Sequence, residues 1–194
     1  MSTTIEVNKQ SVKQFLETGK IKKFVIPEYQ RPYAWTDEQN QVLFDDLAEY
    51  TANNNESTYF LGSIVAYEND HNEQEIIDGQ QRITTLFLFL RAIYAKLENS
   101  YEKEALFLKS QIEPALWEQD DLTGEVKPDK ILIMSRVMGD EGNEEFASIL
   151  VSGEADVKSK SNYSKNYSLI QHLLNEYATN EPLSFYRFIS KKAI

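Results

Sequence analysis

The sequence predicts an α+β fold, in which a small α/β core is followed by a mainly helical C-terminal extension. Short runs of β-branched and aromatic residues, typical of strands, alternate with apolar patterns of helical period in the first hundred residues. Beyond residue 100 the helical pattern predominates. We therefore expect the 194 residues to divide into a core over 1–100 and a helical extension over 101–194.

The composition is typical of a packed globular protein. Hydrophobic residues make up 41% and aromatic residues 12% of the chain, which is enough for a substantial core. The absence of cysteine excludes disulfides, thiolate metal sites and cysteine nucleophiles. The N-terminus lacks the pattern of a signal peptide, and the longest apolar run is too short to span a bilayer. We expect a soluble, cytoplasmic protein with no membrane partner.

The charge distribution argues against a broad basic face for DNA. The formal net charge is −11, whereas wrapping of DNA depends on Lys and Arg that neutralise phosphates. The first 35 residues hold six basic and three acidic residues, a net of +3, which leaves −14 for the rest. Only Arg31 and Arg82 are basic between Lys23 and Arg91. We therefore expect each of these two isolated arginines to have a specific local role.

The first hundred residues predict three helices and three strands. Apolar residues on one face predict a helix over 11–18, and Gly19 is expected to stop it. The capping-box pattern Thr36–Gln39 begins a predicted helix over 37–50. A third helix, over 83–97, follows from apolar residues at helical spacing. β-branched and aromatic residues predict strands at residues 24–26, 59–67 and 75–77.

The second half of the sequence predicts mainly helices. They are expected over residues 101–117, 143–151 and 163–177, with one strand over 131–134. The charged stretch 118–129 and the Ser/Lys-rich stretch 152–161 are the expected linkers. Residues 182–194 look like the beginning of a helix, so we expect the natural protein to continue beyond Ile194.

The segment from Asp78 to Thr85 joins a predicted strand to a predicted helix through a glycine turn. The first N–H groups of a helix lack intrahelical partners, and the helix dipole favours negative charge there, so this junction is a ready anion site. Side chains suited to phosphates or a metal ion surround it, namely Asp78, Gln80, Gln81, Arg82, Thr84 and Thr85. The structural alternative is a capped turn in which Arg82 pairs with an acid such as Asp78.

A second polar cluster lies in the segment Ile26–Trp35, where two prolines restrict the backbone. Such a rigid loop can hold Arg31 at a phosphate and offer an aromatic ring to a base. Its candidate nucleotide contacts are Tyr29, Gln30 and Arg31. The structural alternative is that Tyr33 and Trp35 pack under the following helix and that Glu28 is a solvated or structural acid.

Three segments, in this order, resemble the signature of the GmrSD restriction endonuclease N-terminal domain family. They are Ile26–Trp35 (IPEYQRPYAW), Tyr59–Ser63 (YFLGS) and Ile77–Leu86 (IDGQQRITTL). The resemblance covers about residues 8–98. That family is similar to the ParB/sulfiredoxin superfamily, whose small α/β core binds nucleotide through the segment that corresponds to 78–82. The resemblance therefore implies a ParB/sulfiredoxin-like core.

The resemblance also implies binding and hydrolysis of an NTP, ATP or GTP, with Mg²⁺, coupled to restriction of modified phage DNA. On this reading Arg82 and Arg31 hold phosphates, and Asp78 holds Mg²⁺ or orients water. Gln80 or Gln81 contacts the base, the ribose or the attacking water. The predicted catalytic residues are Asp78, Gln81 and Arg82. The predicted nucleotide-binding residues are Tyr29, Gln30, Arg31, Gly79, Gln80, Arg82, Thr84 and Thr85.

Departures from the relatives limit what this chain can do. Sulfiredoxin chemistry needs a cysteine, so peroxiredoxin repair is excluded. An HNH-type nuclease needs clustered histidines, and only His71 and His172 occur. We expect DNA cleavage to belong to a downstream or partner HNH-type domain, and contact with modified DNA to the full-length protein. A non-hydrolysing nucleotide switch, a ParB-like nuclease and homo-oligomerisation stay open.

Overall fold

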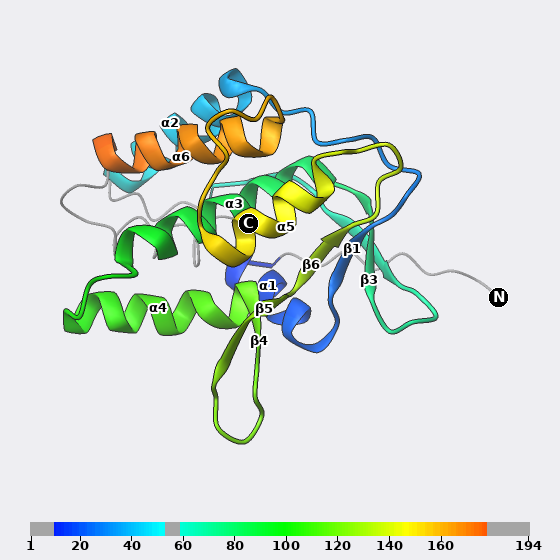
Figure 1. Ribbon diagram of the computed structural model, residues 1–194, viewed down its shortest axis with the longest axis horizontal. Coiled ribbons are helices and arrows are strands. Elements are labelled where there is room, and N and C mark those ends of the chain that lie inside the picture. Colours follow the sequence, from blue (N-terminus) through cyan, green and yellow to red (C-terminus); the bar gives the residue numbers. More distant parts are fainter. Residues whose placement is uncertain (1–9, 53–58, 178–194) are drawn as a thin grey trace.

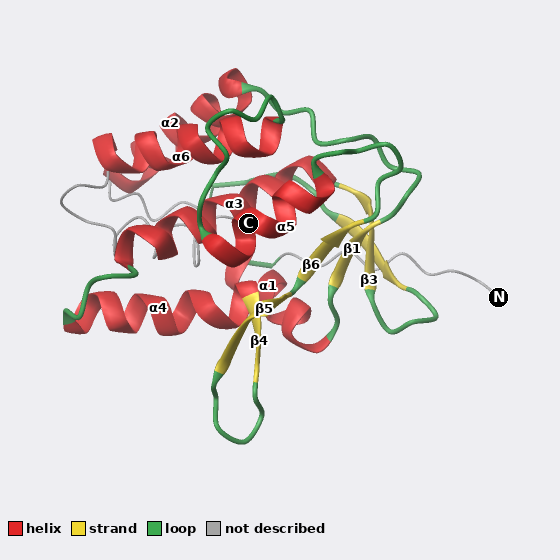
Figure 2. Ribbon diagram, in the orientation of Figure 1, coloured by secondary structure: helices red, strands yellow, loops and turns green. Residues whose placement is uncertain are grey.

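The computed structural model describes residues 10–52 and 59–177 of the chain. These residues form six helices, a four-stranded sheet and a two-stranded hairpin (Figures 1 and 2). The predicted α+β class is confirmed. The helix start predicted over 182–194 lies outside the described residues. No helix in the described ranges has the length and apolar character needed to cross a membrane.

The four-stranded sheet has the order β2-β3-β1-β6. Its strands are β2 (Val65–Glu68), β3 (Gln74–Asp78), β1 (Phe24–Ile26) and β6 (Ile133–Ser135). β1 runs parallel to both β3 and β6, and β2 runs antiparallel to β3. All three residues of β1 are buried, as expected for a central strand rich in apolar side chains.

The helix α3 (Gln80–Leu97) is the centre of the hydrophobic core. It is buried on almost all sides, which suits its continuous apolar run from Leu86 to Leu90. Three further helices pack against it, namely α4 (Lys103–Leu116), α5 (Asn143–Ser152) and α6 (Asn162–Tyr177). The helix α2 (Asp37–Ala52) lies beside α6 (Figure 1). The helices predicted in these regions are confirmed.

Elements from beyond residue 100 complete the sheet and the core. β6 extends the sheet beside β1, and α5 and α6 cover α3. The division of the chain into two domains near residue 100 stays a prediction. The residues after 100 nevertheless form part of the same sheet and pack against the same core helix as the residues before it.

The helix α1 (Val12–Ile21) begins at a capping box formed by Ser11 and Gln14. The prediction that Gly19 stops this helix is wrong, because Gly19 lies inside it. Gly19 instead allows a close approach, since a Cβ there would come within 2.5 Å of Cε2 of Phe24. The glycine is therefore explained by the packing of α1 on β1.

Two sequence predictions about strands are corrected by the structure. The strand expected over 59–67 is regular only at its end, as β2, because residues 60–64 have no regular secondary structure. The stretch 118–129, expected to be a linker, contributes to an antiparallel hairpin. Its strands are β4 (Trp117–Gln119) and β5 (Val126–Ile131). Most of this hairpin is solvent-exposed, so it lacks the apolar alternation that marks a half-buried strand.

A buried arginine joins α3 to the C-terminal end of α5. Arg91 is 1% exposed, and its Nε donates a 3.1 Å hydrogen bond to the carbonyl oxygen of Leu150. Its guanidinium group also lies 5.4 Å from the ring centres of Tyr94 and Trp117. The negative end of the α5 dipole and the two ring faces therefore stabilise this cation.

Candidate functional site

The turn between β3 and α3 is shaped by Gly79. Asp78 is the last residue of β3, Gly79 has φ 88° and ψ 12°, and α3 begins at Gln80. This left-handed conformation is strained for residues that carry a Cβ. A Cβ on Gly79 would also lie 2.9 Å from the carbonyl oxygen of Ser63. The predicted strand and glycine turn are thus confirmed, whereas the helix begins at Gln80, three residues before the predicted start at Ile83.

The N-terminus of α3 offers backbone donors to an anion. Gly79 is the N-cap residue and provides no side-chain cap. The N–H of Ile83 donates to the carbonyl oxygen of Gly79 and makes the first intrahelical bond, 3.0 Å long. The N–H groups before Ile83 have no intrahelical partners, so they and the helix dipole favour a negatively charged group.

Arg82 lies against the backbone of Gly62. The exposed guanidinium group donates a 3.0 Å hydrogen bond from Nη1 to the carbonyl oxygen of Ser63. Gly62 has φ 115°, and a Cβ there would come within 2.6 Å of Nε of Arg82. Within the described residues Arg82 forms no ion pair, with Asp78 or with another acid. Gly62 and Ser63 therefore support Arg82 and leave its charge without a counter-ion among the described residues.

The side chain of Gln81 holds the loop 27–35 against the turn. Its Oε1 accepts hydrogen bonds from the N–H groups of Ala34 (2.7 Å) and Trp35 (3.2 Å). Its Nε2 donates to the carbonyl oxygen of Pro32, 3.1 Å away. Gln81 is 5% exposed. Because both ends of this buried amide are occupied by the loop, the geometry gives Gln81 a positioning role.

The two threonines near the start of α3 are buried, and Thr85 contacts the same loop. The hydroxyl groups of Thr85 and Tyr33 lie 2.7 Å apart, and Thr84 is 1% exposed. Burial raises the pKa of the Tyr33 hydroxyl group. The structural alternative places Tyr33 under the following helix. Tyr33 is buried, and its ring lies against that of Tyr163 on α6.

The helix α6 holds the loop 27–35 from the other side. Nδ2 of Asn162 donates to the carbonyl oxygen of Tyr33 (3.1 Å), and Nδ2 of Asn166 donates to that of Trp35 (2.8 Å). These contacts join residues about 130 positions apart in the sequence. Sequence reasoning missed both asparagines, because polar residues on a helix give no signal of a distant backbone partner.

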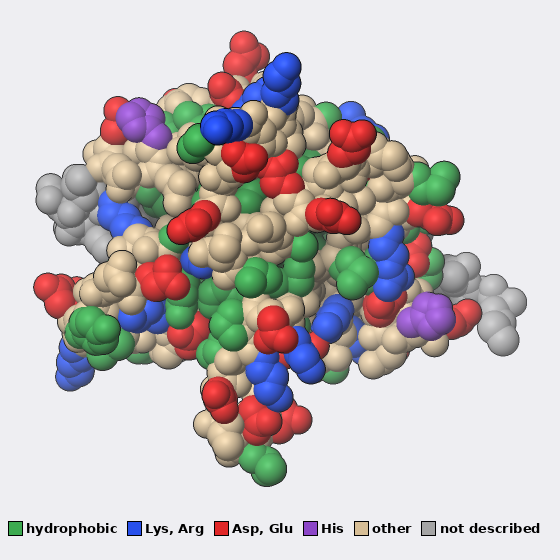
Figure 3. Space-filling view, viewed as in Figure 1, with side chains coloured by type: hydrophobic (Ala, Val, Ile, Leu, Met, Phe, Trp, Pro, Cys, Tyr) green, Lys and Arg blue, Asp and Glu red, His purple; other side chains and the backbone are tan. Residues whose placement is uncertain are grey.

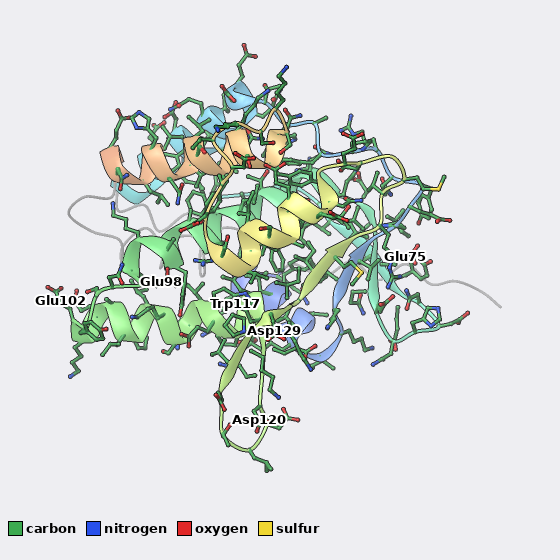
Figure 4. All side chains as sticks on the ribbon, in the orientation of Figure 1. Glu75, Glu98, Glu102, Trp117, Asp120 and Asp129 are labelled. Atoms are coloured by element: carbon green, nitrogen blue, oxygen red, sulfur yellow. The ribbon has the colours of Figure 1, made fainter. Side chains whose placement is uncertain are left out.

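Tyr29 and Gln30 attach the loop to β3. Nε2 of Gln30 donates to the carbonyl oxygen of Ile77 (2.7 Å). The hydroxyl group of Tyr29 donates to Glu75 (3.0 Å), which is labelled in Figure 4, while the ring stays 65% exposed. Burial opposes ionisation of Glu75, but hydrogen bonds from Tyr67 and Tyr29 outweigh it and lower its pKa. Tyr29 thus presents an anchored and exposed ring.

Arg31 is exposed, and the loop on both sides of it is fixed to the turn. Gln30 and the carbonyl group of Pro32 make those contacts, to Ile77 and Gln81 respectively. The loop with Arg31 and the turn with Arg82 are therefore neighbours. Convergence of the two guanidinium groups on one concave site stays a prediction.

Sequence reasoning also missed Gly62 and Ser63 as parts of the site. The signal was a glycine inside a stretch that otherwise resembles a strand, which often marks the close approach of another group. Here that group is the guanidinium of Arg82. The three segments Ile26–Trp35, Tyr59–Ser63 and Ile77–Leu86 meet around the β3–α3 turn.

Metal ligands are sparse in the described part of the chain. No group of three or more His, Asp or Glu residues within it is arranged to hold a metal ion. His71 is exposed, and His172 is exposed beside Glu176 on α6. The exposed carboxylate of Asp78 is the acid nearest to the turn in sequence, which makes it a candidate ligand.

The fold and the turn define an α+β domain with a strand–glycine–helix junction at Asp78, Gly79 and Gln80. The model of the GmrSD restriction endonuclease N-terminal domain matches residues 12–193. The chain belongs to this family, which associates it with restriction enzymes. The match extends well beyond the three motifs and includes α4, α5 and α6. The comparison with curated proteins found no match.

Proposed function

We propose that the β3–α3 turn binds the phosphates of a nucleoside triphosphate. The observation that carries this proposal is the placement of Arg82 in the first turn of α3. Its exposed guanidinium is supported by Gly62 and Ser63 and has no carboxylate partner among the described residues. A guanidinium group suits bidentate contact with phosphate, and the helix dipole acts on the same anion.

The residues of the turn also fit Mg²⁺ as the companion of a nucleotide. Mg²⁺ in such sites is usually held by one or two carboxylates together with phosphate oxygens and water, and not by a cage of protein ligands. The exposed carboxylate of Asp78 at the end of β3 meets this requirement. When bound, Mg²⁺ supplies charge neutralisation at the phosphates.

The exposed residues of the loop 27–35 complete the proposed site. Arg31 provides a second cation for the phosphates, and the anchored ring of Tyr29 provides a flat apolar surface for a base. The buried residues Gln81 and Thr85 have a different role, because they fix the loop to α3. Gln80 is also buried, at 8% exposed, but its amide makes no hydrogen bond to the loop among the described residues, so we assign it to the nucleotide or water.

We infer that the domain hydrolyses the nucleotide, and that this activity is coupled to restriction of modified DNA. Hydrolysis asks mainly for positioning and charge neutralisation, which Arg82, Arg31 and Asp78 supply. The DNA-cutting step belongs, on this proposal, to an HNH-type nuclease domain downstream or in a partner, and contact with modified DNA to the full-length protein.

The geometry of Gln81 favours a second candidate, a nucleotide-sensing switch with negligible turnover. This amide is occupied by the loop and therefore does not orient an attacking water molecule. Nucleotide binding at the turn would then act on the loop 27–35 and, through Asn162 and Asn166, on α6. A ParB-like nuclease has less support, since no group of three acids or histidines gathers in the described residues.

Calorimetric titration with ATP, GTP, CTP and UTP in the presence of Mg²⁺ tests the proposal. We expect at least one of these nucleotides to bind at one site per chain. Steady-state release of phosphate then separates the two candidates, because an NTPase turns over and a switch does not. Failure of all four nucleotides to bind would contradict both.

A further inference from the structure

The hairpin of β4 and β5 is an arm with an apolar tip. It projects from the body of the molecule (Figure 1), and Asp120 lies near its far end (Figure 4). Leu122, in the connecting turn, is 97% exposed. The exposed acids Asp121 and Glu125 flank it, and Figure 3 shows acidic groups and a hydrophobic side chain gathered at the end of the arm. Leu122 therefore contributes no burial to its own fold.

The turn that presents Leu122 is held in one conformation. Oδ1 of Asp120 accepts hydrogen bonds from the N–H groups of Leu122 and Thr123, each 3.1 Å long. Oδ2 of the same residue pairs with Lys127, 3.2 Å away. The backbone bonds from Thr123 and Leu122, followed by Lys127, lower the pKa of Asp120 to about 2. A turn ordered in advance loses little entropy when its tip is bound.

A cavity between α1 and α4 is lined by aliphatic and basic side chains, which complement the leucine and the acids at the tip of the arm. Its volume is about 200 Å³, larger than the ~150 Å³ apolar cavities that can hold a benzene ring. Aliphatic side chains form much of its wall, namely Val12, Leu16, Leu90 and Ile112. Lys13 and Lys20 also line it, together with the single acid Glu17. A lining that combines aliphatic side chains with a net positive charge suits an apolar side chain flanked by acids.

We propose that the tip of this arm docks into the α1–α4 cavity of a second copy of the chain. Leu122 enters the cavity, and Asp121 and Glu125 lie against Lys13 and Lys20. The tip of the arm does not dock into the cavity of its own chain, because β4 and β5 hold it away from the body of the molecule (Figure 1).

The connectivity favours a reciprocal dimer. Leu116 ends α4 and Trp117 begins β4, so the arm starts where one wall of the cavity ends. Arm and cavity therefore lie at the same end of the molecule, and two copies related by a two-fold axis exchange arms in both directions. Both docking contacts form at once, which closes the assembly at two chains.

The absence of cysteine allows a direct test by crosslinking. Thr123→Cys places a thiol beside Leu122 and keeps the leucine, while Ser110→Cys places one in the cavity lining. The two variants are mixed and treated with a short bismaleimide. We expect a crosslinked species of twice the chain's mass that contains one copy of each variant. Ser148→Cys, on the exposed surface of α5, replaces Ser110→Cys in the matched control and should give no such product.

Sedimentation velocity of the uncrosslinked proteins supplies the second measurement. We expect the unmodified chain to dimerise and Leu122→Ser to raise the dimer dissociation constant at least tenfold, with an unchanged circular dichroism spectrum, because Leu122 is exposed in the single chain. A monomer at all concentrations would overturn the proposal. A dimer that Leu122→Ser leaves equally stable would overturn it too, since its interface would then lie elsewhere.

Discussion

The guanidinium group of Arg82 occupies the space in which Gly62 would carry a side chain. A Cβ on Gly62 would lie 2.6 Å from Nε and 2.8 Å from Cζ of Arg82, and Nη1 of Arg82 donates to the next carbonyl oxygen, that of Ser63. This contact joins two segments 20 residues apart and fixes the direction of an exposed cation. The binding of an anion at the turn should therefore be sensitive to changes at Gly62 as well as at Arg82.

Gly62→Ala should displace Arg82 and weaken nucleotide binding. The added methyl group meets the guanidinium, and φ 115° is strained for alanine, at a cost of about 1–3 kcal/mol. Since Arg82 is a flexible side chain, it moves away and the fold persists. We expect the affinity for NTP to fall about tenfold in a calorimetric titration, with a lowered melting temperature.

Gly124→Ala is the matched control for Gly62→Ala. Gly124 also has a positive φ, 69°, but a Cβ there meets nothing within 4 Å. It should lose some stability from backbone strain and keep its affinity for NTP. Equal loss of affinity in both variants would show that strain, and not the position of Arg82, governs binding.

Gln81→Ala should loosen the loop 27–35. The substitution removes three hydrogen bonds of a buried amide and leaves their backbone partners unsatisfied, so we expect a loss of about 1–3 kcal/mol in the free energy of unfolding. Amide hydrogen exchange should accelerate at Ala34 and Trp35. Gln14→Ala, which breaks only the capping box of α1, is the control and should leave exchange in this loop unchanged.

The junction around Asp78–Arg82 could be predicted from the sequence because its signals are local. A strand pattern, Asp-Gly and a helix pattern follow one another within a few residues. The residues that support this junction could not be predicted, because Gly62, Asn162 and Asn166 lie between 16 and 88 residues away in the chain. The β4–β5 hairpin was missed for a different reason. Most of its residues are exposed, so its sequence lacks the alternation of apolar and polar residues that predicts a strand.

Stability should decline in alkaline solution from about pH 10. Burial, followed by the hydrogen bond to Glu113, raises the pKa of Tyr94 to about 12, and burial raises that of Tyr167 to about 12. Between the ordinary value of 10.0 and these values the unfolded chain loses these protons while the folded chain keeps them. The free energy of unfolding should therefore be unaffected by these groups below pH 10 and fall as the pH rises through 12. Urea titrations at several pH values measure the free energy of unfolding, and tyrosinate absorbance follows the ionisation of the tyrosines.

Asp78→Ala should reduce turnover more than nucleotide affinity. If the carboxylate serves Mg²⁺ or orients water, its removal leaves the phosphate contacts of Arg82 in place. We expect phosphate release with Mg²⁺ to fall at least tenfold while the dissociation constant for the nucleotide changes less. Titrations and turnover assays at several Mg²⁺ concentrations check this, and a loss of affinity as large as the loss of turnover would oppose this division of roles.

The central claim is that the charge of Arg82 binds nucleotide phosphate, and calorimetric titration of Arg82→Ala with NTP and Mg²⁺, beside its thermal melt, tests it most directly. Loss of a charge-assisted bidentate contact costs about 1.5–3 kcal/mol, so we expect a ten- to hundredfold loss of affinity with an unchanged fold. Arg82→Lys should recover only part of the lost affinity for NTP, because lysine keeps the positive charge but lacks the planar guanidinium group. A lowered melting temperature with unchanged affinity for NTP would contradict the claim and make Arg82 a purely structural clamp on Ser63.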